Sequence, residues 1–125
     1  MRDPIFGPPP VLTDESVEDY QECYRRVIEH FAPQDAVELH LVRDYADHDW
    51  EILRWRRRKV EAMSDIPDIY LDQTSATLTR TERLNRIIDD EEKGRNRCYR
   101  AIVRHREMSR DLFRGGTKRN KKDAA

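Results

Sequence analysis

The stretch QDAVELHLVRDYADHDWEILRWRRRKVEAM, residues 34–63, decides the fold. As a helix rising about 1.5 Å per residue, it would be about 45 Å long. Placing its residues about 100° apart gives two apolar faces. The first face holds Leu39, Val42, Ala46, Trp50, Leu53 and Val60, and the second holds Leu41, Tyr45, Ile52 and Trp55. Because so much of its circumference is apolar, we expect this helix to lie between two other helices.

A shorter helix is predicted over residues 16–31. Ser16 can accept a hydrogen bond from the first turn as its N-cap, and Asp19 stands at the reciprocal capping-box position. One apolar face follows at helical spacing, made of Val17, Tyr20, Tyr24, Val27 and Phe31. Ala32-Pro33 ends the helix, because the residue before a proline avoids the α region.

The third helix is predicted over residues 80–113, with a capping-box spacing between Thr79 and Glu82. Gly94 lies inside it and indicates either a close helix contact or a kink. Gly115-Gly116 should stop it. The stripe of residues that this helix is expected to turn toward its neighbours consists of Leu84, Ile87, Ile88, Glu91, Arg95, Cys98, Tyr99, Ile102, His105 and Leu112. Residues 64–79, which include Pro67, are expected to form a connection folded over the end of the hairpin.

These segments predict an all-α, three-helix arrangement dominated by a long antiparallel helical hairpin of the coiled-coil kind. The 125 residues suit one domain. Residues 1–15 are expected to form an extended arm, because Pro8-Pro9-Pro10 cannot be helical. Residues 16–113 form the helical domain, and residues 114–125 form a flexible, disordered basic tail.

Composition excludes several classes of protein. Charged residues make up 39% of the chain, and no apolar run approaches the roughly 20 residues needed to span a bilayer. No secretory signal is visible, and Cys23 and Cys98 fall on apolar helix positions, where buried free thiols are the simplest interpretation. We therefore expect a cytoplasmic protein.

The hairpin register predicts one specific ion pair. An antiparallel arrangement that pairs Val60 with Leu84 also pairs Val42 with Ile102 and brings Arg57 near Glu91. We expect Arg57 and Glu91 to form an interhelical ion pair, shared with Arg95; the alternative is that both side chains reach solvent. Asp49, on the same helix, either is a buried carboxylate paired with Arg56 or an arginine of another helix, or marks the gap between two contact faces.

Charge is distributed unevenly along the chain. Residues 1–53 hold 4 basic and 13 acidic residues, whereas residues 95–122 hold 11 basic and 2 acidic ones. This polarity indicates either a nucleic-acid-binding end or two ends that attract each other on folding. The candidate nucleic-acid contacts are Arg97, Arg100, Arg104, Lys118, Arg119, Lys121 and Lys122.

No catalytic or cofactor motif is apparent. The sequence has no phosphate-binding glycine loop and no cysteine pair at zinc spacing, so no cofactor is expected. The best metal constellation is His40, Asp44, Asp47, His48 and Glu51. These residues lie on the most polar arc of the central helix and lack the Glu-x-x-His arrangement of di-metal bundles, so we interpret them as a solvated face.

Several motifs resemble a known group of proteins. They are Phe31-Ala32-Pro33, Leu39, Leu41-Val42, Trp50-Glu51-Ile52-Leu53-Arg54 with Arg57, then Glu91 and Cys98-Tyr99-Arg100-Ala101-Ile102. They are similar to uncharacterised bacterial helical proteins that often neighbour mobile elements, in which a LAP…LEELLVERIA…WRLRRA helix precedes an E-x4-R-x2-YRAL helix. Asn96 stands where that pattern has arginine, and the proline arm replaces a basic, glycine-containing segment. The resemblance implies the helical hairpin and the Arg57–Glu91 pair, and no established activity.

We therefore expect a non-enzymatic helical interaction module that binds itself or another protein. The alternative is a nucleic-acid-associated accessory protein that uses the basic third helix and tail. A metal-dependent enzyme that uses the acidic face of the central helix is a third, weaker hypothesis. No membrane association is expected.

Overall fold

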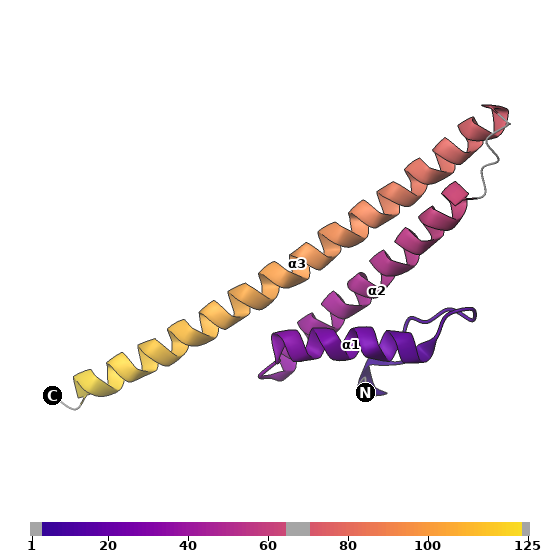
Figure 1. The fold of residues 1–125 in the computed structure, drawn as a ribbon. Coiled ribbons are helices and arrows are strands. Elements are labelled where there is room, and N and C mark those ends of the chain that lie inside the picture. Colours follow the sequence, from indigo (N-terminus) through magenta and orange to yellow (C-terminus); the bar gives the residue numbers. More distant parts are fainter. Residues whose placement is uncertain (1–3, 65–70, 124–125) are drawn as a thin grey trace.

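The computed structural model describes residues 4–64 and 71–123, with side chains over residues 5–64 and 78–112. A short 3-10 helix, η1 (Pro4–Phe6), precedes three α-helices: α1 (Val17–Phe31), α2 (Ala36–Ser64) and α3 (Leu71–Asp123). Helices α2 and α3 form the predicted antiparallel hairpin, and α1 crosses the first half of α2 (Figure 1). The all-α prediction is confirmed.

The signals that bound α1 act as predicted. The Ser16 hydroxyl accepts a hydrogen bond from the backbone N–H of Asp19 at 3.2 Å. Ala32 takes a left-handed conformation with φ 45°, and its N–H donates to the carbonyl of Ile28. Helix α2 then starts two residues later than predicted, because Asp35 caps it by accepting the N–H of Glu38 at 2.8 Å.

The core lies where all three helices meet. Its buried members are Tyr20, Tyr24, Val27 and Phe31 of α1, Val42, Ala46 and Trp50 of α2, and Ile102 of α3. Val42 and Ile102, predicted to pair, both belong to this cluster and are both 0% exposed, which agrees with the predicted register. On the second face of α2, Ile52 is 1% exposed. Residues 36–64 are therefore a continuous helix packed between α1 and α3 over its first half.

Helix α3 is longer than predicted at both ends. It begins at Leu71 instead of residue 80, so Thr79 and Glu82 lie inside it and not at its cap. Residues 71–79 contain no proline or glycine, and the polar residues there weaken a helix by only a few tenths of a kcal/mol each. The nearest strong helix breaker before Leu71 in the sequence is Pro67, which lies outside the described residues.

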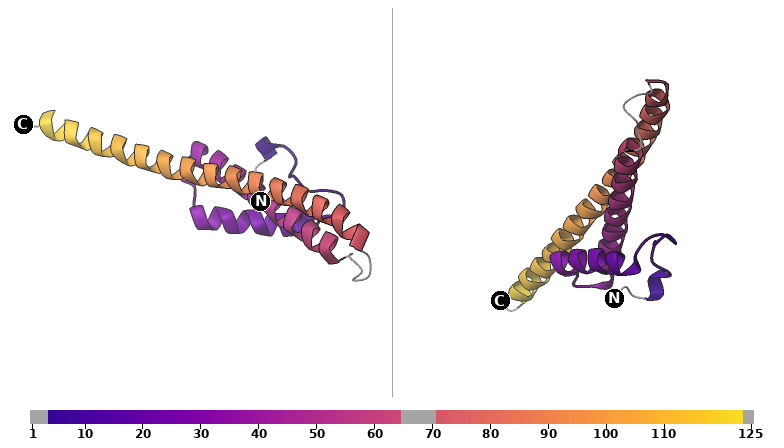
Figure 2. Two further views of the ribbon diagram at one scale, coloured as in Figure 1. Left: turned by 90° about the horizontal axis from the view of Figure 1, so that it is seen from above. Right: turned by 45° about the vertical axis from the view of Figure 1, so that its right-hand side comes forward.

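The predicted stop at Gly115-Gly116 is also wrong, because α3 continues through Asp123. Each glycine costs about 1 kcal/mol relative to alanine, which weakens a helix without forbidding it. The lysines and arginines that follow are good helix formers, and their charge favours a helix C-terminus. The last part of α3 thus projects beyond the hairpin, and residues 114–123 belong to it instead of to a separate tail (Figure 2).

Over its described residues, the N-terminal arm is irregular apart from the η1 turn, and it packs on α2. Phe6 lies edge-on to His40, with ring centroids 5.0 Å apart, and the guanidinium of Arg43 lies 4.4 Å from the Phe6 ring centroid. Val11 packs against the core cluster, whereas Ile5 and Leu12 are exposed. None of the helices, over the described residues, is long and apolar enough to cross a membrane.

Candidate interaction surfaces

Charged pairs join α2 to α3 along the seam of the hairpin. His48 Nδ1 lies 2.6 Å from Glu91 Oε2, and Arg95 donates to Asp49 at 2.8 Å. Nearer the start of α2, Arg106 donates to Glu38 at 2.6 Å, and His105 lies 2.8 Å from Asp35. Arg56 donates to Glu92 at 2.8 Å further along. Asp49 is therefore paired with an arginine of another helix, as one predicted alternative had it, although its side chain is half-buried and 29% exposed.

The predicted Arg57–Glu91–Arg95 pair does not form. Glu91 pairs with His48, Arg95 pairs with Asp49, and Arg57 is exposed. The reason is which face of α2 meets α3. The pairs made by His48 and Arg56 place α3 on the second apolar face, so Arg57 points elsewhere. Val60, predicted to pack in this seam opposite Leu84, is instead 64% exposed.

Gly94 allows α2 and α3 to approach closely at this seam. A Cβ added to Gly94 would lie 2.6 Å from Cε1 of the His48 ring, closer than a carbon contact permits. The close-contact interpretation of Gly94 is therefore confirmed. The His48–Glu91 pair lies at the same level, so the absence of a side chain at Gly94 is what lets the imidazole reach the carboxylate.

Arg54 joins the N-terminal arm to α2 through a set of contacts that we call the Arg54 clamp, and no local pattern in the sequence predicts it. Its guanidinium donates to both carboxylate oxygens of Glu15, at 2.9 and 2.7 Å, and to the Pro10 carbonyl at 2.6 Å. It also donates to Glu51 at 2.6 Å. Both Arg54 and Glu15 side chains are 6% exposed, and the hydrogen bond from Arg54 lowers the pKa of Glu15. Only tertiary contact joins these residues, which are 39 positions apart.

The polar residues of α2 that we interpreted as a solvated face, and not as a metal site, are divided among separate contacts. Asp47 accepts a hydrogen bond from the Tyr20 hydroxyl at 2.6 Å, His48 pairs with Glu91, and Glu51 accepts from Arg54 and Trp55. Asp35, Glu38 and His105 do bring possible ligand atoms within 4.8 Å of one another. These three groups are already engaged, because His105 contacts Asp35 and Arg106 neutralises Glu38.

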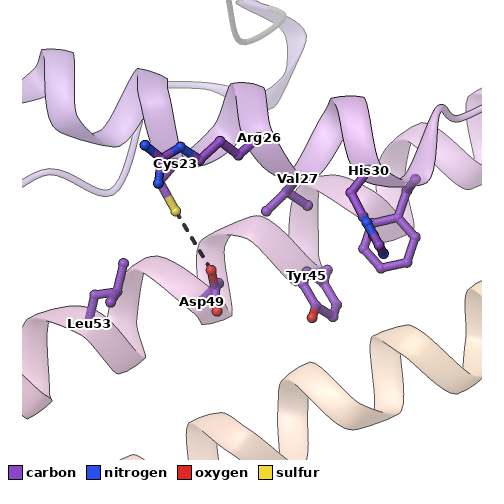
Figure 3. Close-up of a pocket in the computed structure, with 8 residues that line it drawn as sticks. Cys23, Arg26, Val27, His30, Tyr45, Asp49 and Leu53 are labelled. Atoms are coloured by element: carbon purple, nitrogen blue, oxygen red, sulfur yellow. Dashed lines mark hydrogen bonds between the residues drawn. The ribbon is translucent and has the colours of Figure 1, made fainter.

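A hollow of about 490 Å³ lies beside α1 and α2, and Figure 3 shows its lining. Cys23 of α1 points across it toward Asp49 of α2, with Sγ 3.9 Å from the carboxylate. Burial and the nearby Asp49 charge raise the pKa of Cys23 to about 11. Burial also raises the pKa of Cys98. Both thiols are half-buried and stay protonated at neutral pH, so neither is an activated nucleophile.

A second hollow, of about 560 Å³, lies further along the same hairpin. We call it the distal groove. It is lined by Arg56, Lys59, Val60 and Met63 of α2 and by Asn85, Ile88, Asp89 and Glu92 of α3. The sequence pattern does not predict this groove, because it places Val60 in the buried seam between the two helices.

Helix faces divide the basic residues of α3 into two groups. Arg95, His105 and Arg106 face α2 and pair with its acidic residues. Arg97, Arg100 and Arg104 are exposed, and among the described side chains they take part in no ion pair. The first group therefore agrees with attraction between the basic and acidic parts of the chain, and the second group remains available for a nucleic acid. The backbones of Lys118, Arg119, Lys121 and Lys122 lie in α3, but their side chains are outside the described ones.

Comparison with protein-family models, curated proteins and solved structures finds no match for this chain. The resemblance to helical proteins near mobile elements stays a prediction.

Proposed function

We propose that this protein is a non-enzymatic helical interaction module whose distal groove binds an amphipathic helix of a partner protein. The observation that carries the proposal is the difference between the two halves of the hairpin. The first half is a three-helix core, because α1 covers it (Figure 1). The second half consists of two helices with an open groove between them, in which Val60, Met63 and Ile88 are apolar.

The groove is a continuation of the surface that α1 covers. With residues about 100° apart, Val60 falls within about 40° of Val42, Ala46 and Leu53 on the circumference of α2. Val42 and Ala46 are buried in the core formed with α1, whereas Val60 is 64% and Met63 is 53% exposed. A helix seated there would bury against Val60 and Met63 just as α1 buries against Val42 and Ala46.

The floor of the groove is apolar and its walls are charged. Ile88 of α3 is 7% exposed and lies between the two helices, beside Val60 and Met63. Arg56 and Lys59 stand on the α2 wall. Hydrophobic floors with polar rims are the usual anatomy of helix-binding grooves.

Charge on the two walls defines the partner helix. The α2 wall is basic, through Arg56 and Lys59, and the α3 wall is acidic, through Asp89 and Glu92. Arg56 and Glu92 neutralise each other across the groove. Lys59 and Asp89 form no ion pair among the described side chains. A complementary helix carries an acidic flank on one side of its apolar stripe and a basic flank on the other.

A second copy of this chain fits the groove less well. If two grooves meet face to face with their α1 helices at opposite ends, the basic α2 walls oppose each other. If the α1 helices lie at the same end, each occupies the layer that the other copy needs, since α1 and the groove are on the same side of α2. Like-charge contact and steric overlap thus favour a different partner.

A designed peptide tests the proposal. The probe is a fluorescein-labelled, 21-residue helix with a leucine stripe, a glutamate flank and a lysine flank, titrated with the full chain by anisotropy. We expect saturable binding, with at least a tenfold loss for Val60→Asp combined with Met63→Asp. Val17→Asp combined with Val37→Asp is the matched control, because both residues are apolar, lie outside the groove and are 46% and 51% exposed.

A peptide with lysine on both flanks should bind several-fold more weakly than the mixed-flank probe. Light scattering identifies the competing occupant. If the natural chain is a dimer and the Val60→Asp, Met63→Asp variant is a monomer, the occupant of the groove is a second copy of this chain and not a partner helix. Peptide binding that is absent, or unchanged in that variant, would overturn the proposal.

A further inference from the structure

The outer face of α3 carries a row of basic residues that the hairpin does not use. We call Lys93, Arg97, Arg100 and Arg104 the basic stripe. They recur at spacings of four, three and four, so they share one side of the helix. All four are exposed, and among the described side chains they form no ion pair.

The stripe faces away from the rest of the fold. Arg95, Cys98 and Ile102, on the other side of α3, face α2 or its core cluster, and Ile102 is 0% exposed. Helices α1 and α2 lie together on one side of α3, so its outer face is open along the hairpin (Figures 1 and 2). A ligand on the stripe therefore competes with neither the core nor the distal groove.

We propose that the basic stripe binds the phosphate backbone of a nucleic acid duplex, without reading base sequence. From Lys93 to Arg104 the helix rises about 16 Å. A DNA duplex carries about nine negative charges over that length, counted on both strands, so enough phosphates are present for all four cations. Guanidinium groups also donate two parallel hydrogen bonds to phosphate oxygens, which suits Arg97, Arg100 and Arg104.

The surroundings limit the size of the contact. Asp89 and Asp90 precede the stripe, and Glu107 and Asp111 follow it on α3. These carboxylates repel phosphates, so the contact covers about three helical turns and about four phosphates. The described residues near the stripe form no recognisable element for reading base edges, so we propose contact with the phosphate backbone of the nucleic acid alone.

Other anionic partners fit this stripe less well. A helix that lies on a membrane surface buries an apolar face beside its basic flank. In α3 the face opposite the stripe is already packed on α2. An acidic protein offers charge at lower and less regular density than a duplex. The linear, exposed row of cations therefore favours a nucleic acid.

The test uses the full chain and a fluorescein-labelled, 30-base-pair DNA duplex of arbitrary sequence, with binding followed by anisotropy between 20 and 200 mM KCl. Four phosphate contacts predict that log K falls against log[salt] with a slope of about −3.6. Exchanging all four stripe residues for glutamine should weaken binding more than tenfold at 50 mM KCl and flatten the slope. A duplex of different sequence should bind equally well.

The matched control removes the same charge elsewhere, with Arg26, Arg57, Arg80 and Arg83 changed to glutamine; all four are exposed and none lies on the face of the stripe. Its binding should change less than threefold. A third variant, with Lys118, Arg119, Lys121 and Lys122 changed to glutamine, assigns any contribution of the end of α3. Equal losses in the stripe and control variants would overturn the proposal. So would absent binding, or equal affinity for polyglutamate or phosphatidylserine vesicles.

Discussion

The imidazole ring of His48 lies against Gly94 so closely that a Cβ on Gly94 would come within 2.6 Å of His48 Cε1. This relationship fixes the level at which α2 and α3 pair, because His48 Nδ1 also meets Glu91 at 2.6 Å. A side chain on the glycine would therefore require the His48 ring to move from the position in which it meets Glu91.

We expect Gly94→Ala to destabilise the protein by about 1–3 kcal/mol, as overpacking a close helix contact does. The higher helix propensity of alanine offsets only about 1 kcal/mol of this effect. The measurement is the free energy of unfolding in urea. Adding His48→Ala to the same chain removes the clash, so the double variant should be more stable than Gly94→Ala alone. If it is less stable, the glycine serves another purpose.

Arg54 should be the charged residue on which stability depends most. Replacing it with alanine leaves Glu15 buried without its partner and frees the Pro10 carbonyl. Breaking a buried ion pair by removing one member costs about 3–5 kcal/mol. Arg58→Ala is the control, because Arg58 pairs with Asp14 at 3.4 Å and Asp14 is 71% exposed. That variant should lose less than about 1 kcal/mol. Similar losses in both would contradict the clamp.

Acid should release the N-terminal arm. The hydrogen bond from Arg54 lowers the pKa of Glu15 from its ordinary value of 4.5. A carboxyl with a lowered folded-state pKa stabilises the fold above its unfolded pKa and loses that contribution as pH falls toward the folded value. The difference in unfolding free energy between the natural chain and Glu15→Gln should therefore be constant above pH 4.5 and shrink below it. A difference that stays constant down to pH 3 would contradict this.

The sequence predicted best what neighbouring residues decide. Ser16 and Ala32-Pro33 set the ends of α1 through local hydrogen bonds and backbone sterics. The two apolar faces of residues 34–63 correctly predicted a continuous central helix. The end of α3 was missed because a glycine pair is a weak breaker in a sequence otherwise rich in helix formers.

What failed was the assignment of faces to neighbours. Periodicity shows that α2 has two apolar faces, but only packing decides which of them meets α3. When the face of Val60 is taken as the one that meets α3, Arg57 becomes the expected partner of Glu91, whereas the partner in the structure is His48. The same assumption buries Val60, so the distal groove is not predicted. The Arg54 clamp was missed because its partners lie in the arm, 39 and 44 positions away. A polar residue flanked by apolar ones on a central helix is a weak signal that it is buried and paired.

Cys23 should react slowly with alkylating reagents. Burial and the Asp49 carboxylate raise its pKa to about 11, so the reactive thiolate is scarce at pH 8. We expect iodoacetamide to modify Cys23 at least tenfold more slowly than it modifies a short peptide cysteine. Asp49→Asn removes the nearby negative charge and should raise the rate. Since Asp49 also holds Arg95 at 2.8 Å, Arg95→Gln is the control that loosens the same seam and keeps the carboxylate. Faster labelling in both variants would assign the slow reaction to packing; faster labelling in Asp49→Asn alone assigns it to charge.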